Sequence, residues 1–127
     1  MQWIFSFFYR LLGDHLIITR ILSFILGIFS VIGIYFFLKN VSRNQLVAMI
    51  GAWAFNFSPV FYYYTLNPLP DNFALCCGIW GLVFFTRWIQ DATGRGLVLT
   101  GAFLSLAALT KLPFILYFIF PFAYLLT

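Results

Sequence analysis

Apolar residues dominate the chain in long runs, which are separated by short polar or proline-containing segments. The runs predict five helical segments, which cover residues 16–38, 45–64, 72–88, 97–110 and 114–127. A helix needs roughly 20 apolar residues to cross the hydrocarbon core of a bilayer. Within the second segment, Pro59 is expected to kink the helix, because proline disrupts helical hydrogen bonding. The pattern predicts an all-α integral membrane bundle of four to five transmembrane helices, with residues 1–127 forming one domain.

The first apolar run is too short to span a membrane. It lies within residues 2–12, carries Trp3 and Tyr9, and ends at Arg10, so its polar and aromatic residues are typical of a membrane surface. No basic region precedes the run and no small-residue cleavage site follows it, which argues against a signal peptide. We therefore expect an N-terminal interfacial helix over residues 2–12.

The composition agrees with a membrane protein. Hydrophobic residues make up 64% of the chain and charged residues 8%, whereas soluble domains carry about 25% charged residues. The net charge of +4 is too sparse for a nucleic-acid-binding surface. The expected partner is therefore the lipid bilayer, and nucleic-acid binding is not expected. Because the chain is still apolar where it reaches Thr127, we expect it to be a piece of a longer protein.

The positive charges predict an orientation in the membrane. One pair of polar turns holds Lys39 with Arg43 and Arg87 with Arg95, and short cytoplasmic loops are enriched in such residues. These turns are therefore expected to be cytoplasmic, in the inner or plasma membrane of a cell or in the endoplasmic reticulum. The polar residues expected at the opposite, periplasmic or lumenal face are Asp14, His15, Arg20, Asn67, Asp71 and Lys111.

Asp71 is the most informative of these polar residues. A carboxylate beside a membrane is costly unless it is solvated or paired, and the preceding Asn67-Pro68-Leu69-Pro70 segment is expected to be a rigid loop. Asp71 is therefore a candidate substrate-binding residue and a candidate ligand for a divalent cation. The alternative is a helix cap in a hydrated loop, where the helix dipole favours a negative charge.

Lys111 and Arg20 are candidate substrate-binding residues on the same side. Because the third and fourth segments are antiparallel and joined by a short turn, Lys111 is expected at the same depth as Asp71. Its ammonium suits a phosphate-bearing lipid, although a lysine that only extends toward the interface is an alternative. Arg20 is expected either to bind a lipid phosphate or to form a structural salt bridge.

Other chemistry has little support. Asp14 and His15 provide too few ligands for a metal site, and the adjacent Cys76 and Cys77 are expected to be small core residues. The sequence contains no glycine-rich phosphate loop, nucleophile elbow or zinc motif. Beyond a possible divalent cation at Asp71, no cofactor is predicted.

Several short sequence motifs follow one another in the same order as in a known protein family. They are Leu12-Gly13-Asp14-His15 with Arg20-Ile21-Leu22-Ser23, residues 27–39, Ser58-Pro59 with Tyr63-Tyr64, Leu69-Pro70-Asp71, and Ala108-Leu109-Thr110-Lys111. The chain resembles the polyprenyl-phosphate-sugar-dependent glycosyltransferases of the family 39 type. These include protein O-mannosyltransferases and lipid A aminoarabinose transferases of the GT-C class.

The resemblance implies a transferase that takes a sugar from a polyprenyl-phosphate donor at the outer face and passes it to a protein or lipid acceptor. By position, Asp71 matches the family's second acidic residue, near the donor or a divalent cation, and Lys111 lies in its Leu-Thr-Lys element. The family's principal catalytic acid lies upstream of the position of Met1, so the catalytic residue is unknown and this chain alone is expected to be inactive.

Transfer needs a base for the acceptor and charge stabilisation for the departing polyprenyl phosphate. The chain offers the second through Arg20, Lys111 and a cation at Asp71. The competing hypothesis is a non-catalytic membrane module, either a transporter piece or an accessory subunit.

Overall fold

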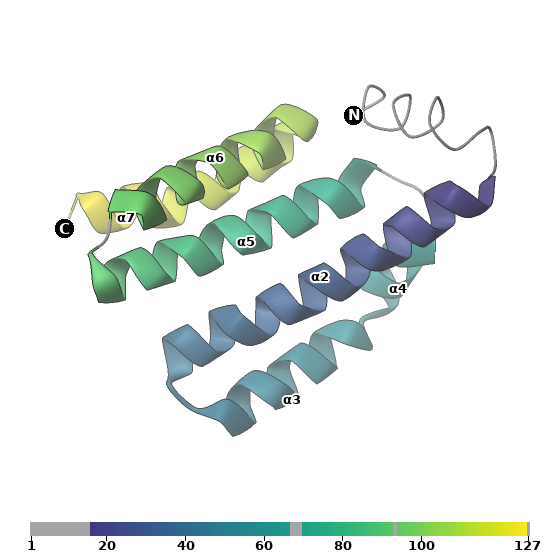
Figure 1. Ribbon diagram of the computed structural model, residues 1–127, viewed down its shortest axis with the longest axis horizontal. Coiled ribbons are helices and arrows are strands. Elements are labelled where there is room, and N and C mark those ends of the chain that lie inside the picture. The colour runs from purple at the N-terminus through teal and green to yellow at the C-terminus, as the bar shows by residue number, and fades with distance from the viewer. Residues whose placement is uncertain (1–15, 67–69, 93, 127) are drawn as a thin grey trace.

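The computed structural model describes residues 16–66, 70–92 and 94–126, and these residues form an all-α structure (Figure 1). In chain order the elements are α2 (Leu16–Ser42), α3 (Gln45–Asn56), α4 (Pro59–Leu66), α5 (Pro70–Asp91), α6 (Gly94–Thr110), the 3₁₀ helix η1 (Leu112–Phe118) and α7 (Ile119–Leu125). The expected interfacial helix over residues 2–12 lies outside the described residues, as do Asp14 and His15. The all-α fold class is confirmed.

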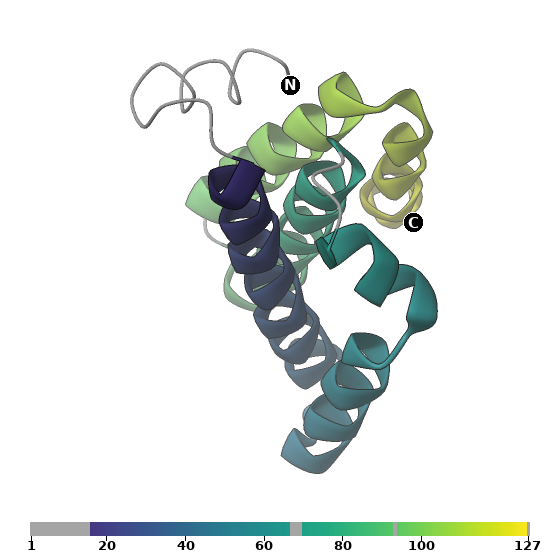
Figure 2. The ribbon, with the colours of Figure 1, turned by 90° about the vertical axis from the view of Figure 1, so that its right-hand side faces the viewer.

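α5 is the central helix of the bundle. It packs against α2 on one side and against α6 on the other (Figure 1), and in the view of Figure 2 it lies between α2 and the C-terminal segment. Its buried apolar side chains include Ala74, Ile79, Val83 and Phe85. α2 and α5 run in the same direction and α6 runs against them, so the starts of α2 and α5 share one end of the bundle with the last turn of α6.

Two glycines permit close packing on the two sides of α5. A Cβ atom at Gly33 of α2 would lie 2.7 Å from Ile79 Cγ2, and one at Gly81 of α5 would lie 2.6 Å from Leu104 Cδ2. Small residues let membrane helices approach closely, where van der Waals packing replaces the hydrophobic driving force that lipid does not supply. Trp80 Nε1 also donates a hydrogen bond of 3.2 Å to the carbonyl of Phe29 across the α2–α5 contact.

The predicted second segment is divided into α3 and α4. The helical hydrogen bonds end where Ser58 N donates to the carbonyl of Phe55, and α4 restarts with Pro59 at its first position. Proline suits the first turn of a helix because its missing N–H has no partner there in any case. The kink expected at Pro59 is therefore a full break between two helices.

α2 and α5 are both longer than the apolar runs that predicted them. α2 continues through the expected polar turn to Ser42, whose hydroxyl donates to the carbonyl of Leu38 over 2.7 Å. The turn itself holds Arg43, with a φ of 52°, and Asn44, whose side chain caps α3 by accepting from Leu46 N. α5 likewise includes residues 89–91, which lie beyond the end of the predicted segment 72–88.

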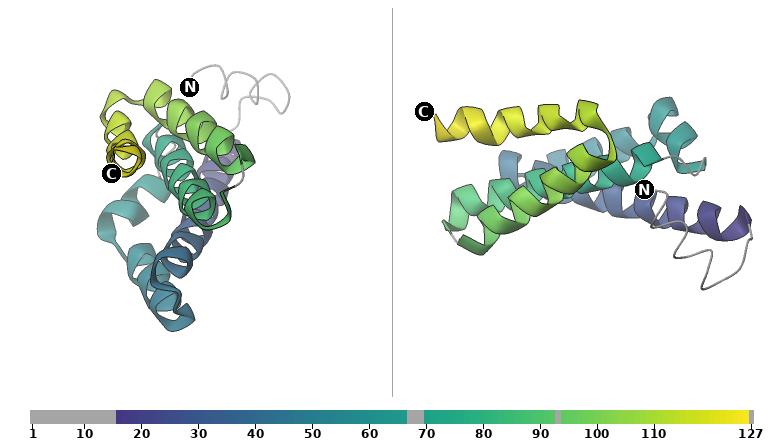
Figure 3. Two further views of the ribbon diagram at one scale, coloured as in Figure 1. Left: turned by 90° about the vertical axis from the view of Figure 1, so that its left-hand side faces the viewer. Right: turned by 90° about the horizontal axis from the view of Figure 1, so that it is seen from above.

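The last apolar segment starts as a 3₁₀ helix and ends as α7. Figure 3 shows the chain reversing direction after α6 so that this segment runs back. A continuous α-helix would require the amide of Pro121 to donate to the carbonyl of Tyr117, and proline has no N–H. This missing donor accounts for the change of helix type.

Two of the described helices are long and apolar enough to cross a membrane, namely Thr19–Ser42 and Asp71–Asp91. Gly94–Thr110 and Leu112–Leu125 are shorter apolar helices. Many large apolar side chains lie on the outer surface, among them Phe24, Trp53 and Phe120. An exposed apolar surface of this kind is suited to contact with lipid.

The glycine packing predicts a matched pair of stability effects. Gly81→Ala introduces a Cβ that collides with the fully buried Leu104, and we expect it to lower the free energy of unfolding by about 1–3 kcal/mol, the usual cost of overpacking. Gly101→Ala in α6 meets nothing within 4 Å and is expected to be neutral or stabilising, because alanine favours the helix. Unfolding both variants in mixed micelles measures the difference. Equal stability of the two would contradict the packing described.

Candidate functional site

Asp71 and Lys111 form an ion pair at the end of the bundle where α5 begins and α6 ends. The distance from Lys111 Nζ to Asp71 Oδ1 is 2.6 Å. The carboxylate side chain is 17% exposed and the lysine side chain 44% exposed, so the pair lies at the edge of the packed region. The expectation that Lys111 lies at the depth of Asp71 is confirmed.

The local sequence explains how the two side chains meet. Asp71 is in the first turn of α5, where its negative charge interacts favourably with the positive end of the helix dipole. α6 ends at Thr110, and Lys111 adopts an extended backbone with φ −154° and ψ 119° before Pro113 enters η1. Because α5 and α6 are antiparallel and joined by a short turn, the start of one lies beside the end of the other.

A half-buried ion pair is costly to break on one side only. Removing either partner leaves the other charge in a poorly solvated position, and the cost rises with burial. The carboxylate is the more buried partner, so loss of the lysine removes its nearest compensating charge. The pair therefore holds the two helix ends together as well as placing a cation at the surface.

Asn72 is a site residue that the sequence analysis missed. Its side chain is 1% exposed, and its Nδ2 donates a 2.7 Å hydrogen bond to the carbonyl of Ser23 in α2. Its Oδ1 has no hydrogen-bond partner among the described residues. This contact fixes the first turn of α5 against α2, so Asp71 is held from two sides: by Lys111 directly and by its neighbour Asn72.

The signal for Asn72 was present but weak. An amide directly after Asp71 and before an apolar run is compatible with a helix start, which is how the sequence alone would place it. The partner is a backbone carbonyl 49 residues away, and no local pattern predicts such a contact.

Arg20 is not joined to the pair. It is exposed on α2 and has no carboxylate partner among the described residues, although it lies toward the same end of the bundle. Cys76 and Cys77 are buried free cysteines of α5, as expected of small core residues. The candidate site is therefore the Asp71–Lys111 pair, with Asn72 next to Asp71 in the first turn of α5.

The described residues around Asp71 do not by themselves fit a divalent cation. Calcium and magnesium take several oxygen ligands, whereas no group of three or more His, Cys, Asp or Glu side chains occurs in the described part of the chain. The Asp71 carboxylate already neutralises an ammonium at 2.6 Å. Within this part of the chain, the positive charge beside Asp71 is that of Lys111.

The whole chain, residues 1–127, matches the model of one family, described as dolichyl-phosphate-mannose-protein mannosyltransferase. No curated protein and no solved structure is similar enough to count as a match. The match covers all the elements on which the sequence resemblance rested, including the segments that hold Asp71 and Lys111. The chain belongs to the dolichyl-phosphate-mannose-protein mannosyltransferase family, which consists of membrane glycosyltransferases of the GT-C type.

Proposed function

We propose that this protein transfers a sugar from a polyprenyl-phosphate-linked donor to a protein or lipid acceptor, with the phosphate of the donor bound beside the Asp71–Lys111 pair. The family description names a dolichyl-phosphate sugar and a protein acceptor, and a donor and acceptor of these classes are the natural starting point. The observation that carries the proposal is the 2.6 Å ion pair at one end of an otherwise apolar bundle.

Lys111 has the properties required of a phosphate-binding group. Its side chain is 44% exposed while its Nζ is held by Asp71, so an ammonium is presented at a fixed place on the surface. As the sugar leaves, negative charge grows on the polyprenyl phosphate, and a positioned cation in a site with little water stabilises that charge. Asp71 acts through Lys111 by holding the ammonium in place.

Arg20 supplies a second cation at the same end. It is exposed on the first turns of α2 and has no carboxylate partner in the described part of the chain. We assign it to the donor as a more distant contact, since an arginine can meet two phosphate oxygens at once.

The base that activates the acceptor lies outside the described residues. Asp71 is committed to Lys111, and the other described carboxylate, Asp91, is the last residue of α5, at the opposite end of the bundle. The part of the mechanism assigned here is therefore donor binding and stabilisation of the leaving group.

We propose that the end with the ion pair faces the periplasm or lumen. The opposite end carries Lys39, Arg43, Arg87 and Arg95, and short cytoplasmic loops are enriched in such residues. The donor and acceptor would then meet at the outer surface of the membrane.

Cysteine labelling tests this orientation. In a background with both native cysteines replaced by serine, Leu112→Cys beside the ion pair should react with a membrane-impermeant maleimide added outside. Arg43→Cys should react only after the membrane is opened, and Ile28→Cys, on the apolar surface of α2, should react in neither case. The reverse pattern for positions 112 and 43 would contradict the orientation.

Charge removal tests the role of the ion pair. In the full-length protein, we expect Asp71→Asn to lower donor-dependent transfer by about 10²–10³-fold, the usual effect of losing a positioned electrostatic group. Lys111→Met should weaken donor binding, because the ammonium itself is lost. The measurement is transfer by membranes that contain equal amounts of each variant.

Asp91→Asn is the matched control, since it removes an exposed carboxylate at the other end of the same helix. It should leave transfer unchanged. If Asp71 were only a helix cap, Asn would replace it without loss, because Asn and Asp cap equally well. Near-wild-type transfer by Asp71→Asn would therefore show that Asp71 has only a structural role.

A further inference from the structure

The end of the bundle opposite the Asp71–Lys111 pair has an excess of exposed cations. Lys39, Arg43, Arg87 and Arg95 lie there, and all four side chains are exposed. Asp91 is the acidic side chain at this end, and none of the four cations pairs with a carboxylate in the part of the chain that the structure describes. Such clusters at a membrane surface attract anionic headgroups.

Two of these cations are held over neighbouring aromatic rings. Lys39 Nζ lies 5.9 Å from the ring centroid of Tyr35, and Arg87 Cζ lies 5.6 Å from that of Phe36. The two rings contact each other edge to face, with centroids 5.5 Å apart. Cation–π attraction therefore places one cation from α2 and one from α5 around a single pair of rings.

Side-chain hydrogen bonds also fix the two helix ends relative to each other. Asn40 Nδ2 donates to Thr86 Oγ1 over 3.2 Å, and Gln90 Nε2 donates to the carbonyl of Asn40 over 2.8 Å. These contacts join the last turn of α2, which carries Lys39, to the last two turns of α5, which carry Arg87. A pair of cations fixed before binding loses less entropy on binding an anion than two mobile side chains do.

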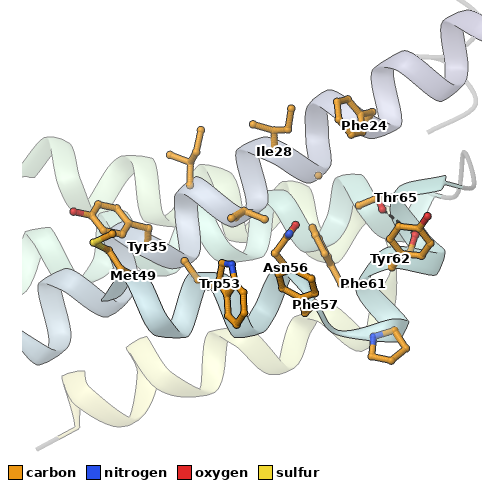
Figure 4. Close-up of a pocket in the computed structure, with 15 residues that line it drawn as sticks. Phe24, Ile28, Tyr35, Met49, Trp53, Asn56, Phe57, Phe61, Tyr62 and Thr65 are labelled. Carbon is orange, nitrogen blue, oxygen red and sulfur yellow. Dashed lines mark hydrogen bonds between the residues drawn. The ribbon is translucent and has the colours of Figure 1, made fainter. Parts of the chain in front are cut away.

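An apolar groove begins at the same place. It lies between α2, α3 and α4, has a volume of about 870 Å³, and has Tyr35 and Met49 at one end and Tyr62 and Thr65 at the other (Figure 4). This volume falls within the range of about 300–1,000 Å³ that is usual for ligand pockets. Because Tyr35 both lines the groove and lies beneath Lys39, the cation and the groove form one continuous surface.

The length of the groove beside α3 fits one leaflet. The 12 residues of α3 rise about 18 Å, and half of a hydrocarbon core of about 30 Å is about 15 Å. Asn56, at the end of α3, therefore lies near the depth at which the chains of one leaflet end. The part of α3 that lines the groove, residues 49–56, rises about 12 Å, so the groove beside α3 covers most of the length of one acyl chain.

We propose that this surface binds an anionic glycerophospholipid, with its phosphate on Lys39 and Arg87 and one acyl chain in the groove from Tyr35 toward Asn56. The two cations match the charge of the headgroup, and the aromatic and aliphatic groove walls match the chain. This site lies at the end opposite the donor site proposed above, so it binds a different lipid, and it does not depend on the proposed transferase mechanism.

Native mass spectrometry of the full-length protein tests the site. The probes are phosphatidylglycerol, phosphatidylcholine with the same acyl chains, glycerol phosphate and inorganic phosphate. Phosphatidylglycerol should bind more tightly than phosphatidylcholine, while the two chainless anions should not bind at the same concentrations. Lys39→Gln and Arg87→Gln should each weaken the binding of phosphatidylglycerol about fivefold, because each surface cation contributes about 1 kcal/mol to the binding of an anionic lipid.

Arg95→Gln is the matched control, because it removes an exposed cation of the same end that has no ring contact in the described structure. It should change phosphatidylglycerol binding by less than twofold. Lys39→Arg keeps the charge and should bind as the wild type does, which separates loss of charge from misfolding. The proposal would be overturned if the two phospholipids bound equally well, or if Arg95→Gln weakened phosphatidylglycerol binding as much as Lys39→Gln and Arg87→Gln do. It would also be overturned if glycerol phosphate bound as tightly as phosphatidylglycerol.

Discussion

The ion pair between Asp71 and Lys111 is the interaction on which the rest of the account depends. A chain with 8% charged residues places almost none of its charge inside the bundle, and a half-buried carboxylate persists there only with a partner. That partner comes from the end of α6, so the pair closes the open end of the α5–α6 hairpin. Asn72 fixes the same turn of α5 to α2, so the start of α5 is tied both to α2 and to the end of α6.

The bundle separates its polar chemistry into two ends. Among the described residues, Asp71 is neutralised by a lysine at one end, and four cations at the other end have no carboxylate partner. Between these ends the helices pack through Gly33 and Gly81 and expose large apolar side chains on the outer surface. This arrangement suits the lipid-linked donor proposed above, which would present a phosphate at the surface and a chain within the bilayer.

Much of this could be predicted from the sequence, because the relevant signals are local. The apolar runs predicted an all-α bundle, and the short α5–α6 turn predicted that Lys111 would reach the depth of Asp71. Pro59 predicted a kink at the place where the structure has a full break between α3 and α4. The residues that escaped prediction depend on contacts that no local pattern encodes. The Ser42 hydroxyl extends α2 by bonding Leu38, and Asn72 reaches a carbonyl 49 residues away. The break between η1 and α7 follows from the missing N–H of Pro121, whose effect on helix type is clear only once the register is known.

We propose that Asp71 and Lys111 act as one unit in donor binding and transfer, and a double-mutant cycle on transfer can distinguish this from two independent roles. The measurement compares donor-dependent transfer by the wild-type protein, the two single variants Asp71→Asn and Lys111→Met, and the double variant. Residues that act as a unit are strongly non-additive, so the double variant should lose about as much activity as the worse single variant. A double variant whose loss equals the product of the two single losses would show that the two residues act independently and would contradict the account.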